Sequence, residues 1–288
     1  MKILIAHDGS PHSAEAIADL ARAGMPGDAE AIVLSVADAW VAPSMPAELA
    51  AGGVDFAASQ AVVDATLAHA RDLAADGARA VRALFPAWKV SSEATAGSPA
   101  WELIRRADEW TPDLLVIGAT GRSNLERAVF GTVANLAATN ARCTVRVARP
   151  RTGAAGPPRV IVAIDGSPGA RAAVDAAASR QWPTGSEAHV VEAVEDWALA
   201  LRGATGSEPS HGAKEAAEAL TKAGLKTEAR LIAGDPKRVL LEHAKTWQAD
   251  TIFVGARGIR ALERFLLGSV SAAIASRATC SVEIVRPR

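Results

Sequence analysis

An internal repeat that covers nearly the whole chain places the strongest constraint on its fold. The segment Lys2–Pro11, KILIAHDGSP, recurs 157 positions later as Arg159–Pro168, RVIVAIDGSP. Further along, the offset falls to 137 and relates Gly118 to Gly255. Each repeating unit has the length of a typical domain, so the sequence predicts two copies of one domain in tandem.

The change of offset also predicts where the two copies differ. A fall from 157 to 137 means that the first copy carries an excess of 20 residues, which we place near residues 41–60. A stretch rich in proline, glycine and alanine, about residues 150–158, has the composition of a linker. We therefore expect one domain over residues 1–150 and a second over residues 158–288.

Short apolar runs alternate with helical patterns in each copy. In the first copy the predicted strands are Lys2–Ala6, Ala31–Ala37, Val90–Ala96, Leu114–Ile117 and Val145–Ala148. Strands that alternate with helices in this way predict an α/β fold, with a doubly wound parallel sheet and helices on both of its faces. Ligands of such sheets bind beyond the carboxyl ends of the strands.

A glycine-rich loop follows the fourth predicted strand of each copy. The loop over residues 118–132 and the loop over residues 255–269 both read Gly-x2-Gly-x9-Gly-(Ser/Thr). Their glycines permit a sharp turn and let the backbone approach a polyanion, while the third glycine opens a helix whose free N–H groups favour phosphate. The alternative is that these glycines only form a turn and a helix start.

An aspartate ends the first predicted strand of each copy, at Asp8 and Asp165. A carboxylate there can accept hydrogen bonds from the hydroxyls of a ribose, or it can cap the helix that follows. Because the first strand lies next to the fourth in a doubly wound sheet, the glycine loop nearby favours the ribose role.

Histidines and cysteines offer little evidence of chemistry. The second copy lacks counterparts of His7 and His12, so we interpret them as a packed strand residue and a surface residue. The six histidines show no metal-ligand spacing. Cys143 and Cys280 are equivalent in the repeat, and we expect two small buried side chains rather than a disulfide.

Two further residue types have open interpretations. Trp40 and Trp197 end the second strand of each copy, and we interpret them as packing anchors in preference to stacking partners of a base. Arg122, Arg257 and Arg260 either neutralise phosphate charge or are solvated, and the sequence favours neither.

The composition excludes several classes of protein. Hydrophobic residues make up 49% of the chain and charged residues 22%, which argues against disorder. The net charge of −1 predicts no nucleic-acid partner. No apolar run reaches the roughly 18 residues that a membrane span needs. The N-terminus lacks the pattern of a signal peptide, so we expect a cytoplasmic protein.

Taken with these motifs, the chain resembles a tandem universal stress protein of the ATP-binding subclass. The resemblance implies a strand order of 3-2-1-4-5 in each domain, pseudo-two-fold pairing of the domains through their last strands, and a possible homodimer. It also implies a site for ATP, with or without Mg²⁺, with adenine held by backbone at Val36 and Ala193. The implied binding residues are Asp8, Val36, Gly118, Gly121, Gly131 and Thr132, then Asp165, Ala193, Gly255, Gly258, Gly268 and Ser269.

The implied function is that of a regulatory or stress-response module with little or no dedicated turnover. The sequence contains no Gly-x4-Gly-Lys-(Ser/Thr) motif and no kinase signature, and we assign no catalytic residue and no metal ligand. A slow Mg²⁺-dependent ATPase and an adenylyl-transferring enzyme are the alternatives within the enzyme class. A flavoprotein subunit for electron transfer and a scaffold with two empty loops are the others.

Overall fold

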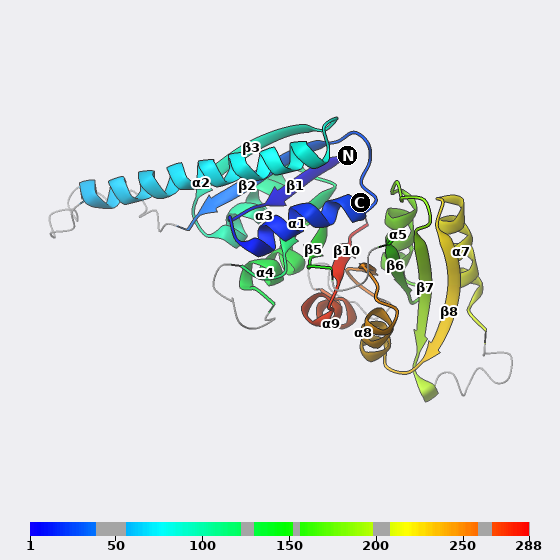
Figure 1. Ribbon diagram of the computed structural model, residues 1–288. Helices are drawn as coiled ribbons and strands as arrows, with labels where there is room; N and C mark the ends of the chain where they lie inside the picture. The colour runs from blue at the N-terminus through cyan, green and yellow to red at the C-terminus, as the bar shows by residue number, and fades with distance from the viewer. Residues whose placement is uncertain (39–55, 122–129, 152–155, 198–207, 259–266, 288) are drawn as a thin grey trace.

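The computed structural model describes residues 1–38, 56–121, 130–151, 156–197, 208–258 and 267–287 (Figure 1). Most of the extra segment predicted near residues 41–60 lies outside the described residues. Trp40, Arg122 and Arg260 lie outside them as well, so the interpretations of these residues stay as predictions.

Each half contains five strands that alternate with helices. The first half comprises β1 (Lys2–Ala6), α1 (Pro11–Asp19), the short 3₁₀ helix η1 (Leu20–Arg22), β2 (Glu30–Ala37), α2 (Phe56–Leu84), β3 (Lys89–Ala96), α3 (Pro99–Trp110), β4 (Leu114–Gly118), α4 (Thr132–Asn140) and β5 (Thr144–Ala148). The second half comprises β6 (Arg159–Ile164), α5 (Pro168–Ala178), β7 (Glu187–Val194), α7 (His211–Lys222), β8 (Lys226–Ala233), α8 (Pro236–Thr246), β9 (Thr251–Gly255), α9 (Ser269–Arg277) and β10 (Ser281–Val285).

All ten strands form one continuous sheet in the order β3-β2-β1-β4-β5-β10-β9-β6-β7-β8. Neighbouring strands within each half run parallel, in the predicted order 3-2-1-4-5. The halves meet through β5 and β10, which pair antiparallel with Arg146 opposite Glu283 (Figure 1). The predicted fold class and the predicted pairing through the last strands are confirmed.

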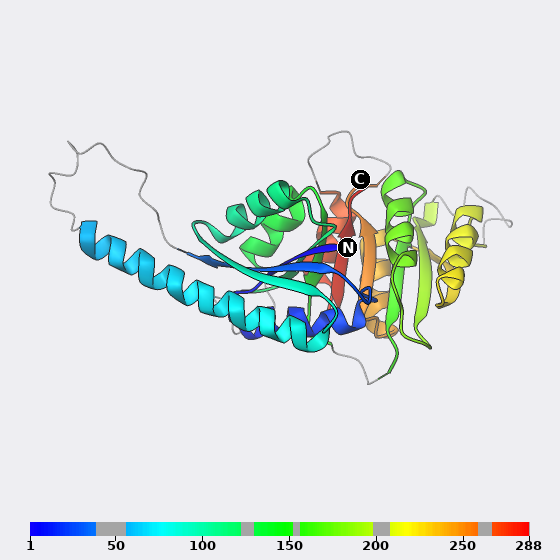
Figure 2. The ribbon, with the colours of Figure 1, turned by 90° about the horizontal axis from the view of Figure 1, so that it is seen from above.

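The two faces of the sheet differ in how they join the halves. On one face, α3, α4, α8 and α9 cover a single hydrophobic core that runs through both halves and includes Val145 and Val282. On the other face, α1 and α2 cover one core and α5 and α7 cover a separate one. Figure 2 shows α1 and α2 on the opposite side of the sheet from α3 and α4. The seam between the halves, where β5 pairs with β10, is therefore apolar on one face only.

Serine side chains start the first helix of each half. Ser10 is the N-cap of α1 and its hydroxyl accepts a hydrogen bond from the N–H of Ser13 at 3.2 Å. Ser167 does the same for α5, accepting from the N–H of Ala170 at 3.1 Å. A proline follows each serine, which suits the first position of a helix because its missing N–H has no acceptor there.

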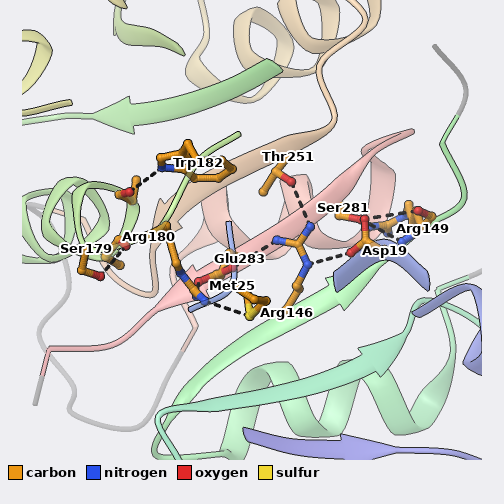
Figure 3. Close-up of polar contacts among 12 residues, drawn as sticks. Asp19, Met25, Arg146, Arg149, Ser179, Arg180, Trp182, Thr251, Ser281 and Glu283 are labelled. Atoms are coloured by element: carbon orange, nitrogen blue, oxygen red, sulfur yellow. Dashed lines mark hydrogen bonds and ion pairs between the residues drawn. The ribbon is translucent and has the colours of Figure 1, made fainter. Parts of the chain in front are cut away.

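A buried polar network occupies the seam on the face where the cores are separate (Figure 3). The guanidinium of Arg146 bonds to Glu283 at 3.1 Å, to Asp19 at 2.7 Å and to the hydroxyl of Thr251 at 3.0 Å. Glu283 also pairs with Arg180. Burial disfavours the charge of Arg146, yet the carboxylates of Asp19 and Glu283 raise its pKa above the ordinary value. Successive side chains of a strand point to opposite faces of the sheet, so Arg146 and Glu283 lie on the face away from the continuous apolar core.

Several side-chain predictions are settled by the structure. Cys143 and Cys280 are both free, as predicted, and burial raises the pKa of their thiols to about 11 and about 12. Cys280 is buried as predicted, whereas Cys143 is only partly buried. The interpretation of Trp197 as a packing anchor is wrong, because its side chain is 60% exposed. Its indole N–H donates instead to Glu195 beyond the end of β7. Within the described ranges, no helix has the length and apolarity that crossing a bilayer requires.

Candidate functional site

A cavity of about 310 Å³ opens at the carboxyl ends of β1, β2 and β4 in the first half. This is the edge where doubly wound sheets bind their ligands. All six residues that the sequence analysis assigns to the first-half site line it, namely Asp8, Val36, Gly118, Gly121, Gly131 and Thr132. The fold therefore brings together positions that lie more than one hundred residues apart in the chain.

The cavity has one apolar wall and one polar wall. Leu34, Val36, Leu103 and Ile117 provide apolar surface from β2, α3 and β4. Polar groups come from α1, from the residues that follow β1, β2 and β4, and from the first turn of α4. A cleft of this size, mostly apolar with a few polar groups at one end, has the form of a small-molecule site.

The N-terminus of α4 faces the polar end of the cavity. Gly131 is the N-cap and no side chain caps the helix, so the N–H groups of the first turn have no acceptor within the helix. The N–H of Gly131 itself donates to the carbonyl of Ala119 at 2.8 Å, which holds the loop against the helix. A β-carbon at Gly131 would lie 3.3 Å from that carbonyl oxygen, closer than side chains normally approach. The glycine is thus required for close approach of the two backbones.

Asp8 lies beside this helix end. Its Oδ1 accepts a hydrogen bond from the N–H of Ser10 at 3.0 Å, and Ser10, not Asp8, is the N-cap of α1. A β-carbon at Gly121 would lie 3.7 Å from Oδ2 of Asp8, so that oxygen faces the glycine loop. The carboxylate orients the turn through one oxygen and presents the other to the cavity region.

The second half repeats this construction. Gly268 is the N-cap of α9 without a side-chain cap, and its N–H donates to Ala256 at 2.8 Å. Oδ1 of Asp165 accepts from the N–H of Ser167 at 2.9 Å. Ala193 lies on β7, partly buried against the continuous core. The backbone that surrounds the predicted site residues is therefore similar in the two halves.

The second-half loop is packed more tightly. A β-carbon at Gly258 would lie only 2.5 Å from Oδ2 of Asp165, against 3.7 Å for the equivalent atoms of the first half. A β-carbon at Gly255 would meet the carbonyl carbon of Gly169 at 2.4 Å. The equivalent of Gly169 is His12, whose carbonyl oxygen would lie 3.0 Å from a β-carbon at Gly118.

A second cavity in the second half lies elsewhere. It has a volume of about 480 Å³ between α5 and α7, and none of the six residues predicted for the second-half site lines it. The structure places Gly258 next to both Asp165 and Gly268, but these residues do not line this cavity. The two halves thus share a backbone design while only the first has the predicted residues around a described cavity.

Sequence reasoning did not select four further polar residues of the first cavity. Ser13, Asp38 and Thr120 line it, and so does His7, which was interpreted only as a packed strand residue. Thr120 lies within the glycine motif and Asp38 directly follows β2, so their position in the chain was a usable signal. The lining role of Ser13 depends on the direction of α1, which the sequence does not reveal. Among the residues that the structure describes, no cluster of three His, Cys, Asp or Glu side chains could hold a metal ion.

Two doubly wound halves in one sheet, each with a glycine loop between its fourth strand and last helix, define a tandem α/β protein of the class that binds ligands at strand ends. The family model of the Universal stress protein family matches residues 1–149 and 157–286. The chain belongs to the universal stress protein family.

Several known proteins are similar to this chain. Universal stress protein MJ0531 of Methanocaldococcus jannaschii is 30% identical over 150 residues, which is 51% of this chain and 81% of that protein. The crystal structure of a universal stress protein from Archaeoglobus fulgidus shares the fold, with a TM-score of 0.67 at 19% identity over 99% of this chain and 96% of that one. A universal stress protein family protein from Arabidopsis thaliana with AMP bound also matches, at 19% identity over 46% of this chain and 93% of that chain, with a TM-score of 0.33.

Proposed function

We propose that this chain binds ATP in the first-half cavity and acts as a regulatory, stress-response nucleotide-binding module with little or no dedicated turnover. The observation that carries the proposal is the cavity itself. Leu34, Val36 and Ile117 form an apolar surface that leads to the N-terminus of α4, whose N-cap Gly131 has no capping side chain. The apolar wall suits an adenine ring, and the helix end suits phosphate.

Four of the predicted first-half residues have a direct part in this arrangement. The backbone of Val36 would hold adenine, and the carboxylate of Asp8 would accept from the ribose hydroxyls. The N–H groups that follow Gly131, together with the hydroxyl of Thr132, would meet the phosphates. In the second half, the matching proposal uses Asp165, Ala193, Gly255, Gly258, Gly268 and Ser269, where Gly258 packs more tightly against Asp165 than Gly121 does against Asp8.

The cavity wall supports binding more than turnover. Phosphoryl transfer needs a cation that stabilises charge as it develops on the phosphate. No lysine or arginine is among the described residues that line the cavity. The described lining thus offers backbone donors to a triphosphate and no cation for its hydrolysis, and for this reason the proposal is binding without dedicated turnover.

Nucleotide extraction and counting test the proposal. We expect purified full-length protein to carry or take up adenine nucleotide, with Gly131→Val abolishing uptake by the first half because a branched side chain would press on the carbonyl of Ala119. Gly268→Val tests the second half in the same way. Gly156→Val is the matched control, because a β-carbon there meets nothing within 4 Å. If neither Gly131→Val nor Gly268→Val lowers occupancy, the site assignment is wrong.

A slow Mg²⁺-dependent ATPase is a second candidate, favoured by one observation. Asp8 and Asp38 both line the cavity that would hold the phosphates. Mg²⁺ is commonly bound by one or two carboxylates together with substrate phosphates. Phosphate release from ATP that requires Mg²⁺, and that Asp38→Asn abolishes without loss of ATP binding, would support turnover over simple binding.

A further inference from the structure

Two arginines cross the seam between the halves in opposite directions. Arg149 directly follows β5, and Arg286 follows β10 at the equivalent position of the repeat. The guanidinium of Arg286 donates to the carbonyls of Ala138 at 2.5 Å, Thr139 at 3.3 Å and Cys143 at 3.2 Å, all in the first half. The bonds are therefore made to the other domain, not to the domain that carries the arginine.

Arg149 makes the reciprocal contacts. Its guanidinium donates to the carbonyl of Cys280 at 3.3 Å and to that of Ala275, both in the second half. Ala138 and Ala275 are equivalent in the repeat, and so are Cys143 and Cys280. The pseudo-two-fold axis of the chain thus relates one arginine contact to the other.

Three of these five carbonyls, those of Ala138, Thr139 and Ala275, are left open where α4 and α9 end. The N–H of Ala141 closes the last turn of α4 on Ala137, so the carbonyls of Ala138 and Thr139 have no acceptor role within the helix. A cation at this end also complements the negative end of the helix dipole. Burial lowers the pKa of Arg286 to about 10, which leaves it charged at neutral pH.

The opposite ends of these two helices form the predicted phosphate sites. Helix α4 is nine residues long and follows its N-cap Gly131, so about 13 Å of helix separates the glycine loop from the arginine contact. The residue that precedes each arginine in the chain also bonds to the glycine loop of its own half. The carbonyl of Val285, next to Arg286, accepts from the N–H of Ala256 in the second-half loop at 2.8 Å.

From this arrangement we infer that Arg286 and Arg149 are positioning residues that couple the two glycine loops, each holding the phosphate-site helix of the other half in place. The inference rests on the proposed function. Loop 255–258 connects to Arg286 through β10, and Arg286 connects to Gly131 through α4. ATP affinity in the first half consequently depends on a residue of the second half that does not line the cavity.

ATP titration of full-length protein tests this coupling. In a Gly268→Val background, the heat of binding reports the first-half site. We expect Arg286→Met to weaken ATP binding there by about fivefold to twentyfold, since the helix loses both its carbonyl partners and a favourable charge. The matched control is Arg149→Met, which removes the equivalent bonds from α9 and should leave first-half affinity within about twofold.

Two further measurements separate positioning from general damage to the seam. Amide hydrogen exchange should accelerate in the last turn of α4 in Arg286→Met, and in the last turn of α9 in Arg149→Met. Arg286→Lys retains the positive charge and should recover part of the ATP affinity. A single cooperative unfolding transition in each variant verifies that the fold is intact.

The results distinguish this inference from the proposed function. If wild-type protein binds no adenine nucleotide, the proposed function fails and the coupling fails with it. If wild-type protein binds ATP and Arg286→Met binds it equally well, the coupling alone is overturned. Equal losses of affinity in Arg286→Met and Arg149→Met would also overturn it, because the effect would then come from the seam as a whole.

Discussion

Arg146 and Glu283 occupy the same position of the two repeats and face each other across the seam, with 3.1 Å between Nη1 and Oε2 and both side chains fully buried. The flanking pairs in the register are Val147 with Val282 and Val145 with Ile284, so the pseudo-two-fold axis passes between the two charges. Pairing of two identical β5 strands in this register would place two Arg146 side chains together. Like charges directly opposite in a sheet are destabilising, and the seam therefore favours unlike halves.

This buried pair predicts a large effect of removing one partner. In Glu283→Leu, the guanidinium groups of Arg146 and Arg180 remain buried without their shared carboxylate. We expect the free energy of unfolding to fall by about 3–5 kcal/mol, measured by urea denaturation. Glu109→Ala is the control, since Glu109 pairs with Arg105 on the exposed face of α3 and its loss should cost less than about 1 kcal/mol. Similar losses in the two variants would contradict the role of the seam pair.

A histidine cluster on the second half predicts a pH dependence of stability. His189 on β7 lies 2.9 Å from His243 on α8, between Nδ1 and Nε2, and stacks on Trp247 at 3.6 Å. Burial lowers the pKa of His189 to about 4, and the positive charge of Arg230 adds to the effect. Glu228, 3.7 Å from Nε2, opposes it. The pKa of His243 is lowered as well, first by burial.

The sign of the effect follows from these lowered pKa values. Between about pH 6.5 and pH 4 the unfolded chain binds a proton at His189 that the folded chain does not, so the cluster's contribution to stability is lost as the pH falls. In His189→Phe, which retains an aromatic ring against Trp247, the decrease in urea midpoint between pH 7 and pH 5 should be smaller than in wild type. An identical decrease in the two proteins would exclude the cluster as the cause.

Close packing at the start of α5 predicts a third effect. A β-carbon at Gly169 would lie 2.4 Å from the carbonyl oxygen of Arg257, so Gly169→Ala should displace the second-half glycine loop and lower stability by about 1–3 kcal/mol. Gly212 has the same place in α7, two residues after its N-cap, and a β-carbon there would be 4.0 Å from the nearest atom. Gly212→Ala should be neutral or stabilise by up to about 1 kcal/mol in the same urea measurement. A loss at Gly212 equal to that at Gly169 would contradict the assigned contact.

The predictable parts of the fold are those that depend on local patterns in the sequence. The alternation of apolar runs with helical patterns, and the helix starts at Ser10 and Ser167, predicted the fold class, because each depends on residues close together in the chain. The strand order came from the resemblance to the family and not from these patterns. Asp8 and the glycine-motif residues could be predicted to lie around one cavity because a strand end and a glycine motif meet at one edge of a parallel sheet, whereas Val36 came from the resemblance to the family.

The contacts across the seam were not predictable in the same way. Arg146 and Glu283 appear in the sequence only as charges within apolar strands, and nothing local indicates that they pair with each other. The reach of Arg286 to α4 depends on the antiparallel register of β5 and β10. The prediction for Trp197 was wrong because a large apolar residue at a strand end usually packs against the core, whereas the side chain of Trp197 is exposed.

The ribose role proposed for Asp8 gives the most specific prediction about the ligand. Asp8→Ala removes the carboxylate that faces Gly121 and should raise the Kd for ATP by about tenfold or more, since hydrogen bonds to a charged group contribute about 1.5–3 kcal/mol. Asp165→Ala, the equivalent change in the second half, should leave first-half affinity unchanged. Both values come from titration in the Gly268→Val background.

A nucleotide without ribose hydroxyls separates recognition from a structural role of the Asp8 turn. Wild-type protein should bind 2′,3′-dideoxy-ATP more weakly than ATP, whereas Asp8→Ala should bind the two with nearly equal affinity because the acceptor is gone. Loss of the turn that Asp8 forms with the N–H of Ser10 would instead weaken both nucleotides in proportion and preserve their ratio. A ratio that stays at its wild-type value in Asp8→Ala would therefore assign the carboxylate to the turn that precedes α1 and remove it from the ligand site.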